Sequence, residues 1–212
     1  MSAFESELFQ SGRRAGGEQV KKFILGIIVA VVAIAAGVYF YFATGSAPVA
    51  TSAHPMPFEA MLANKALHAK INKEMPRTVP IAADDANYAA GATVYRDNCA
   101  VCHGLPNQPK TAIAIGEFPS PPQLFHGKGV TDDPAGETYW KVDNGIRLTG
   151  MPGFGKSLST TQMWQVSLLL ANADKLPANV QQSLAAPLQA PATPPPAAAP
   201  VPAPKRRGRR RG

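Results

Sequence analysis

The sequence predicts a helical protein that is tethered to a membrane and carries one small folded domain. Three observations support this prediction: an uncharged apolar run near the N-terminus, a compact composition over residues 82–178, and helical apolar spacing within that stretch. A chain of 212 residues has room for one domain of about 100–150 residues with additional segments. Charged residues make up only 17% of the chain and 21 residues are proline. The chain therefore consists of segments that differ in amino-acid composition.

Residues 23–43 are predicted to cross the membrane, after a polar N-terminal segment, residues 1–22, on the cytoplasmic side. The run has 21 residues without a charge, and at about 1.5 Å per residue its helix matches the hydrocarbon core of a bilayer. Four Lys/Arg precede the run and none follows before Lys65, so we expect a single pass with the rest of the chain in the periplasm. The alternatives are a cleaved secretory signal, whose apolar region normally covers only about 7–15 residues, and a buried helix.

Residues 44–81 are predicted to form a tether that contains one amphipathic helix. Gly and Pro among small residues make residues 44–57 a linker that leaves the membrane. Residues 58–75 suit a modest helix, with Glu59 near its start and Lys73 near its end as the helix dipole favours. We expect this helix to pack on the domain or on the membrane surface.

Residues 179–212 are predicted to be a disordered tail rich in proline and alanine that ends in a basic octapeptide. The last eight residues contain six Lys/Arg, whereas residues 80–180 contain seven Lys/Arg against nine Asp/Glu. Most of the formal charge of +7 therefore comes from the tail, and the domain is slightly acidic. Outside the cytoplasm no nucleic-acid partner is expected. The tail suits anionic lipid or an acidic partner protein, or it is merely solvated.

The motif that carries chemistry is Cys99-Ala100-Val101-Cys102-His103, a C-x-x-C-H pattern of the kind that attaches haem c covalently. On a helix, two thiols three residues apart lie on one face and reach the two vinyl groups of one porphyrin, while His103 presents its imidazole to the iron. The alternatives are a dithiol oxidoreductase, which needs a βαβ context, and a zinc site, which needs two further ligands.

Met151 is the expected second axial ligand of the iron. It lies in a bend dense in Gly and Pro, residues 150–154, which can bring a thioether close to a flat cofactor. A neutral thioether favours ferrous iron and raises the reduction potential, as suits an electron carrier. The other methionines lie outside the domain or, like Met163, within a helical apolar pattern. His126, in a glycine-flanked loop, is the alternative ligand.

Residues 82–178 resemble a class I c-type cytochrome, a small all-α fold wrapped around one covalent haem. Besides the haem motif, the resemblance rests on Gly91 and Tyr95, eight and four residues before Cys99, and on residues 144–154 around Met151.

The resemblance implies that Gly91 permits a close crossing by the C-terminal helix. It also implies that a backbone carbonyl in the stretch from Pro119 through Pro121 and Pro122 accepts the proximal imidazole N–H. The family's aromatic residue opposite the glycine has no clear counterpart here. Its position falls near Leu168, and Trp164, one turn earlier, is the candidate to take over the packing.

Three helices are expected within this domain. The first covers residues 85–102, the second covers residues 133–144 after a cap at Thr131 or Asp132, and the third covers residues 160–173 after a cap at Ser159 or Thr160. Gly145 is expected to end the second helix. Tyr139, Trp140 and Phe154 are expected to pack around the haem, with surface aromatics that pass electrons as the alternative. Arg147 is expected to be solvated, with a haem propionate as its alternative partner.

Together these features predict a membrane-anchored mono-haem cytochrome c that passes single electrons between redox partner proteins and is not itself an enzyme. No carboxylate pair, nucleophile triad or phosphate loop accompanies the haem motif in the sequence. The alternative function is the cytochrome c subunit of a larger membrane dehydrogenase or oxidase. A third hypothesis is a ligand sensor in which Met151 is displaceable.

Overall fold

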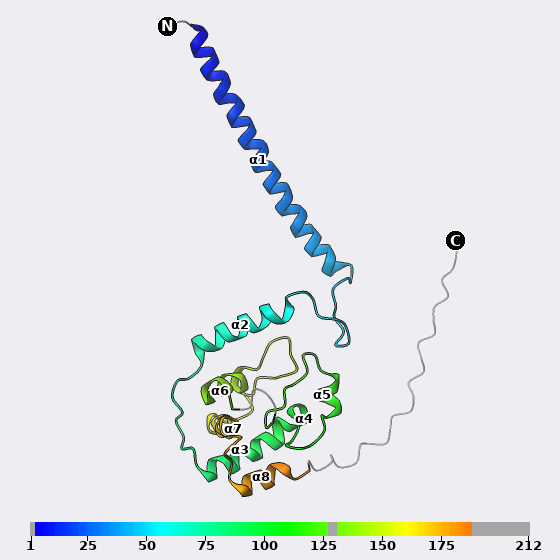
Figure 1. Cartoon of the computed structure of the whole chain (residues 1–212), viewed down its shortest axis with the longest axis vertical. Helices are drawn as coiled ribbons and strands as arrows, with labels where there is room; N and C mark the ends of the chain where they lie inside the picture. The colour runs from blue at the N-terminus through cyan, green and yellow to red at the C-terminus, as the bar shows by residue number, and fades with distance from the viewer. Residues whose placement is uncertain (1–2, 127–130, 188–212) are drawn as a thin grey trace, which may run out of the picture. The chain divides into compact units, whose positions relative to one another are not determined.

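The structure is a computed structural model that describes residues 3–126 and 131–187, with side chains from residue 18 onward. Within those ranges the chain is all-helical and contains no β-strand, which confirms the predicted fold class. The chain divides into two compact units, and the second begins at Leu67. The helices, in chain order (Figure 1), are α1 (Ala3–Ala43), α2 (Glu59–Glu74), α3 (Asp85–Asn98), α4 (Ala100–His103), α5 (Ala112–Gly116), α6 (Ala135–Asn144), α7 (Thr160–Ala171) and α8 (Ala178–Ala185).

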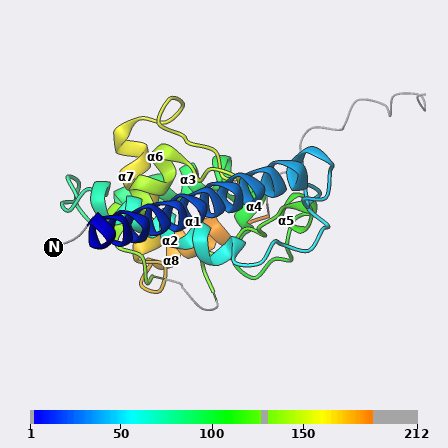
Figure 2. The same cartoon turned by 90° about the horizontal axis from the view of Figure 1, so that it is seen from above.

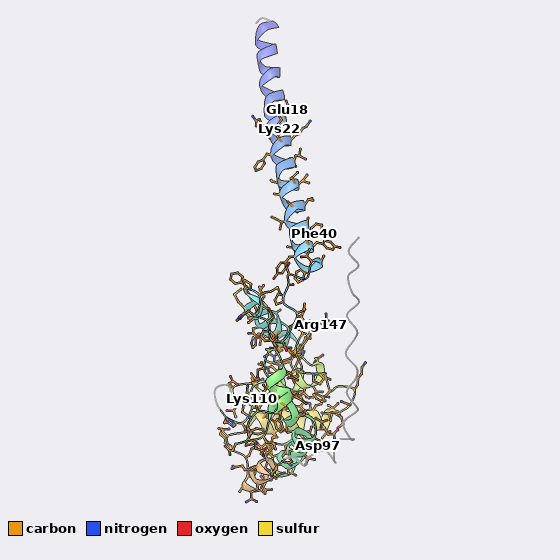
Figure 3. The ribbon with its side chains drawn as sticks, turned by 90° about the vertical axis from the view of Figure 1, so that its right-hand side faces the viewer. Glu18, Lys22, Phe40, Asp97, Lys110 and Arg147 are labelled. Carbon is orange, nitrogen blue, oxygen red and sulfur yellow. The ribbon has the colours of Figure 1, made fainter. Side chains whose placement is uncertain are left out.

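The first helix, α1, starts earlier than the predicted span and ends at the same residue, Ala43. Its part from Glu18 to Ala43 is long and apolar enough to cross a membrane, and none of it is buried. Glu18 and Lys22 lie at the start of the part of the helix that is drawn with side chains, and Phe40 lies near its other end (Figure 3). By length and composition it is the candidate membrane helix that the sequence predicts.

The boundary between the two units falls inside α2, so the tether is shorter than residues 44–81. From Leu67 onward the helix belongs to the folded unit, where Ile71 is fully buried. The indole N–H of Trp140 donates to the Glu74 carboxylate at 3.2 Å. A Cβ at Gly136 would lie 2.0 Å from the carbonyl oxygen of Pro76, so the chain after α2 runs directly against α6. The C-terminal half of α2 therefore packs on the domain.

A close crossing of α3 and α7 forms the centre of the folded unit. A Cβ at Gly91 would lie 2.3 Å from the carbonyl oxygen of Gln165 and 3.1 Å from Leu169 Cβ, so the crossing requires glycine here. Gln165 and Leu169 are the residues nearest to that Cβ, so the contact lies directly beside the expected position, Leu168. Trp164 instead stacks on Tyr139 of α6, with ring centroids 4.3 Å apart.

The helix ends show which capping predictions hold. Ser159, one of the two expected caps, caps α7 and forms a reciprocal capping box with Gln162. The second domain helix, α6, begins two residues later than predicted, and its N-cap is Pro134 rather than Thr131 or Asp132. Gly145 ends α6 with a φ of 68°, as expected.

The folded unit extends past residue 178, where the tail was expected to begin. Helix α8 packs against α3 and buries Val180 and Leu184 in the core. The guanidinium of Arg96 donates to the carbonyls of Ser183 and Ala186, both at 2.7 Å, and so satisfies acceptors at the C-terminal end of α8. The basic octapeptide, residues 205–212, lies outside the described residues.

The haem motif lies at one end of this helical arrangement. Helices α4 and α5 lie at the side of the folded unit away from α6 and α7, as the two views agree (Figures 1 and 2). The core cluster runs continuously from α3 through α7 to α8 and reaches the residues that flank the motif. The helices thus form a frame that presents the motif at its edge.

Candidate functional site

The haem motif consists of Cys99 and the one-turn helix α4, so α3 does not continue unbroken to residue 102 as predicted. Cys99 ends α3, with its N–H bonded to the carbonyl of Tyr95, and also begins α4. The amides of Cys102 and His103 both donate to the Cys99 carbonyl, at 3.1 and 2.9 Å. Both thiols are free and half-buried on this turn. One short stretch of backbone therefore holds the two sulfurs and the imidazole together.

Tyr95 fixes the chain where it leaves the motif. Its buried hydroxyl donates to the carbonyl of Gly104 at 2.7 Å. Its ring packs edge-on against the ring of Phe125, with ring centroids 4.9 Å apart. Burial raises the pKa of Tyr95 above its ordinary value, so the hydroxyl stays a donor. The sequence placed an aromatic residue here without indicating this hydrogen bond, which anchors the backbone directly after His103.

The orientation of the His103 ring is set by Pro122, whose carbonyl oxygen lies 2.9 Å from Nδ1. A carbonyl only accepts, so Nδ1 carries the proton and donates. Burial lowers the pKa of His103, and this outweighs the opposing influence of the Pro122 hydrogen bond and of the Glu117 charge. The imidazole is thus neutral near pH 7 and keeps the lone pair of Nε2 for a metal. Of the three candidate prolines, the structure assigns the carbonyl to Pro122.

The two thiols lack the character of activated nucleophiles. Burial raises the pKa of Cys99 to about 12, and the neighbouring Cys102 raises it further in the same direction. Burial also raises the pKa of Cys102, as do the hydrogen bond from its Sγ to Glu117 and the charge of that carboxylate. Dithiol oxidoreductases need a lowered thiol pKa. The environment of this pair therefore disfavours the dithiol alternative.

Met151 is carried on a loop that folds back onto the end of α6. Its carbonyl accepts the N–H of Ile146 at 3.1 Å, and the amide of Phe154 returns to the Val142 carbonyl at 2.8 Å. A Cβ at Gly145 would lie 2.5 Å from the amide nitrogen of Gly153, so glycine permits this close return. The side chain of Met151 is half-buried and packs against the core cluster. The loop thereby holds the thioether against the folded frame.

Glu117 joins the two parts of the site, a role that the sequence analysis missed. Its carboxylate accepts from the Cys102 thiol at 3.4 Å. A Cβ at Gly150 would lie 2.6 Å from the carboxyl carbon of Glu117, so the same group touches the loop one residue before Met151. A lone acid between an apolar helix and a proline stretch is the only signal of it in the sequence. The contact arises from tertiary folding.

The remaining candidates divide between the frame and the surface. His126 and Arg147 are exposed. Tyr139 and Phe154 are partly buried and pack against the core cluster. Trp140 donates its indole N–H to Glu74 of α2, and its expected packing on the haem stays a prediction.

The donor set fits a c-type haem. Two sulfurs and one imidazole come from a single turn, and the imidazole is fixed through Nδ1 so that Nε2 is free to ligate. A thioether is presented from a separate loop that is connected to that turn through Glu117. Cys99 and Cys102 would hold the porphyrin, and His103 and Met151 would hold the iron.

Comparison with known families agrees with this chemistry. Residues 86–168 match the family model of cytochrome C oxidase, cbb3-type, subunit III. The chain contains a cytochrome c domain. The match runs from the start of α3 into α7 and includes the haem motif and Met151, although it covers less than half of the chain. The C-terminal half of α2 and the whole of α8 extend the domain beyond the matched residues. A comparison with curated proteins gives no match.

Proposed function

We propose that this protein is a membrane-anchored mono-haem cytochrome c that passes single electrons between redox partner proteins. The observation that carries the proposal is the bond between His103 Nδ1 and the Pro122 carbonyl, placed directly beside two half-buried thiols. That bond orients and polarises an imidazole in the way that a metal ligand needs. The match to a cytochrome c family over the same residues supports it.

When bound, haem c supplies a one-electron couple between ferrous and ferric iron. Cys99 and Cys102 fix its position through two thioethers, so the group stays with the chain through repeated turnover. His103 supplies an imidazole whose orientation is set by Pro122. Met151 supplies a neutral, soft ligand that stabilises the reduced state. His103 and Met151 would both ligate the iron, which would leave no position for a substrate and would favour outer-sphere electron transfer.

The surface around the haem motif suits contact with a partner protein. Exposed apolar side chains lie in the motif, in and directly after α5, which contacts α4, and on the Met151 loop, with exposed fractions between 41% and 91%. The Thr111 hydroxyl donates to the Val101 carbonyl at 2.6 Å and holds α5 beside the motif. Two cations close in sequence to these apolar residues are exposed: Arg147 directly precedes Leu148, and Lys110 lies three residues before Ile113. An apolar patch with cationic neighbours favours a partner with an apolar, acidic docking surface. The apolar residues are Val101, Ile113, Ile115, Phe118 and Leu148.

The ligand assignment is tested by paired methionine substitutions in the haem-loaded protein. Met151→Leu keeps the volume and removes the thioether, whereas Met163→Leu makes the same change in the core of α7. We expect Met151→Leu to abolish the methionine-to-iron charge-transfer band and to lower the reduction potential, and Met163→Leu to change neither. An unchanged band and potential in Met151→Leu would remove Met151 from the ligand set.

A second candidate function is supported by the family match. The family is described as subunit III of a cytochrome c oxidase of cbb3 type, so this chain is also a candidate electron-carrying subunit of a membrane oxidase. Mild detergent extraction discriminates the two functions. A stable complex that contains additional haem-bearing chains favours the subunit, and a free chain that exchanges electrons rapidly with a soluble partner favours the carrier.

The anchor and its direction complete the proposal. Lys and Arg before the span and none directly after it favour a cytoplasmic N-terminus and a periplasmic haem domain. We expect protease added to spheroplasts to digest the haem domain and to leave the N-terminal segment intact.

The basic C-terminal octapeptide is proposed to contact anionic lipid or an acidic partner. Truncation after Pro204 should make membrane or partner binding less sensitive to salt, and unchanged sensitivity would mean that the octapeptide is only solvated.

A further inference from the structure

The N-terminal half of α2 carries large apolar side chains that no part of the described structure covers. Phe58, Met61 and Leu62 are 70%, 57% and 60% exposed. Phe58 directly precedes the helix and its carbonyl accepts the N–H of Leu62 at 2.9 Å, so the three residues share one turn. Three large apolar groups in one exposed turn indicate a contact surface and not scattered surface residues.

This surface is separate from the face of α2 that packs on the domain. On a regular helix, the mean direction of Met61 and Leu62 lies about 150° around the axis from that of Leu67 and Ile71. Leu67 is half-buried and Ile71 fully buried within the folded unit. The helix thus has two apolar faces with different surroundings, and the packing of one does not cover the other.

We propose that Phe58, Met61 and Leu62 insert into the lipid interface of the membrane that α1 spans. The inference rests on the anchor in the proposed function. Only 15 residues, from Thr44 to Phe58, separate the end of α1 from this turn, so the membrane is the apolar surface closest to it along the chain. A linker of that length reaches at most about 50 Å when fully extended.

Charge on the same side of the helix agrees with a lipid surface. Lys65 projects between the directions of Met61 and Leu62, one turn further along α2. A lysine in that position lays its methylene stem along the apolar surface and keeps its ammonium at the level of the headgroups. Helix α2 contains three lysines and two glutamates, which favours an anionic surface over a cationic one.

The proposed contact changes what the tether does. With this turn in solution, the linker lets the start of α2 travel up to about 50 Å from the bilayer. With it inserted, the start of α2 stays within about 10 Å of the headgroup boundary. The haem domain is then restricted to electron transfer with partners close to the membrane surface.

The test uses the full-length, haem-loaded protein in nanodiscs of mixed zwitterionic and anionic phospholipid. A nitroxide is attached to Leu62→Cys, to Ala60→Cys as an exposed control on the other side of α2, or to Val32→Cys inside the span. In the haem-loaded protein both native sulfurs are consumed as thioethers, so labelling is specific. Collision with molecular oxygen, which partitions into lipid, is compared with collision with a water-soluble nickel chelate.

We expect the oxygen-to-nickel accessibility ratio at position 62 to exceed that at position 60 several-fold and to fall below that at position 32. Equal ratios at positions 62 and 60, with a lipid-like ratio at 32, overturn this inference and leave the anchor intact. Low accessibility to both reagents at position 62 means that protein covers the turn and also overturns it. A water-like ratio at position 32 overturns the anchor itself, and this inference with it.

Discussion

The two sides of the folded unit are built in different ways. On the frame side, α3, α7 and α8 bury their side chains against one another, and Ala92, Val166 and Leu169 have no exposed surface. On the haem-motif side, α4, α5 and residues 145–155 are held by backbone hydrogen bonds and by Glu117, and several apolar side chains are exposed. Side-chain packing determines the structure of the frame side, whereas the haem-motif side is arranged so that it positions the haem ligands. Changes to the frame should therefore cost stability, and changes to the other side should alter electron transfer.

The largest effect is expected at the helix crossing. Gly91→Val places side-chain carbons where the Gln165 carbonyl lies, at a distance that real Cβ atoms do not tolerate. We expect a loss of about 3 kcal/mol or more in the free energy of unfolding, since backbone and not a flexible side chain must move. Urea unfolding of the haem-loaded protein, followed by circular dichroism, measures it.

Gly116→Val is the matched control on the haem-motif side. Nothing lies within 4 Å of a Cβ at that position. Its stability should change by less than about 1 kcal/mol. If Gly91→Val were as stable as this control, the close crossing would not be part of the fold.

The second largest effect separates the two halves of α2. Ile71→Ala removes a fully buried side chain from the folded unit and should cost about 2–3 kcal/mol of unfolding free energy. Leu62→Ala, at an exposed position of the same helix, should change it by less than about 0.5 kcal/mol. Equal losses would show that the domain packs against the whole helix.

A third prediction concerns the exposed apolar patch beside the haem motif. Leu148→Ser and Ile115→Ser change highly exposed positions, so we expect unfolding free energies within about 0.5 kcal/mol of the unchanged protein. The second-order rate of electron transfer to a partner with an apolar, acidic surface should fall several-fold. Stopped-flow kinetics measures the rate. Val49→Ser, an exposed change outside the folded unit, should leave it unchanged.

The smallest effect is a pH dependence on the frame side. Lys141 pairs with Asp133 at 2.5 Å and with Glu137 at 2.9 Å. Burial acts to lower the pKa of Lys141, but the hydrogen bonds and charges of the two carboxylates outweigh it and raise the pKa above its ordinary value of 10.5. Since the pKa is raised in the folded state, the stabilisation is complete below pH 10.5 and is lost as the pH rises through the raised value.

Lys141→Met should therefore lose less stability than the unchanged protein between pH 9 and pH 11, by about 1 kcal/mol or less. Urea unfolding at the two pH values measures the difference. Parallel pH profiles for the two proteins would mean that the ion pairs contribute nothing to folding.

The sequence predicted those features that local patterns specify. Ser159 was one of two expected caps and does cap α7, and Gly145 ends α6 where a glycine follows a helical stretch. Gly91 was found through a resemblance and is explained by the crossing. Helix α5 was missed because five residues carry too little periodicity, and α8 was missed because its composition resembles the tail that follows.

The contacts that complete the site depend on tertiary folding and leave little trace in local sequence. From the sequence, the carbonyls of three prolines were equally suitable to accept the His103 N–H. Only the folded structure identifies the acceptor as Pro122. Glu117 meets both Cys102 and Gly150, which are far from it in sequence, and no spacing rule predicts that meeting. Helix α2 looked weakly amphipathic because its two apolar faces point in different directions.

The central claim is that this chain holds one haem covalently through Cys99 and Cys102. A pyridine haemochrome spectrum of the expressed protein, recorded after extraction with acidified acetone, tests it most directly. We predict one haem per chain that resists extraction and has the spectrum of a haem with two thioether bonds. A haem that is extracted completely, or a protein without haem when it is produced together with a cytochrome c maturation system, would contradict the account.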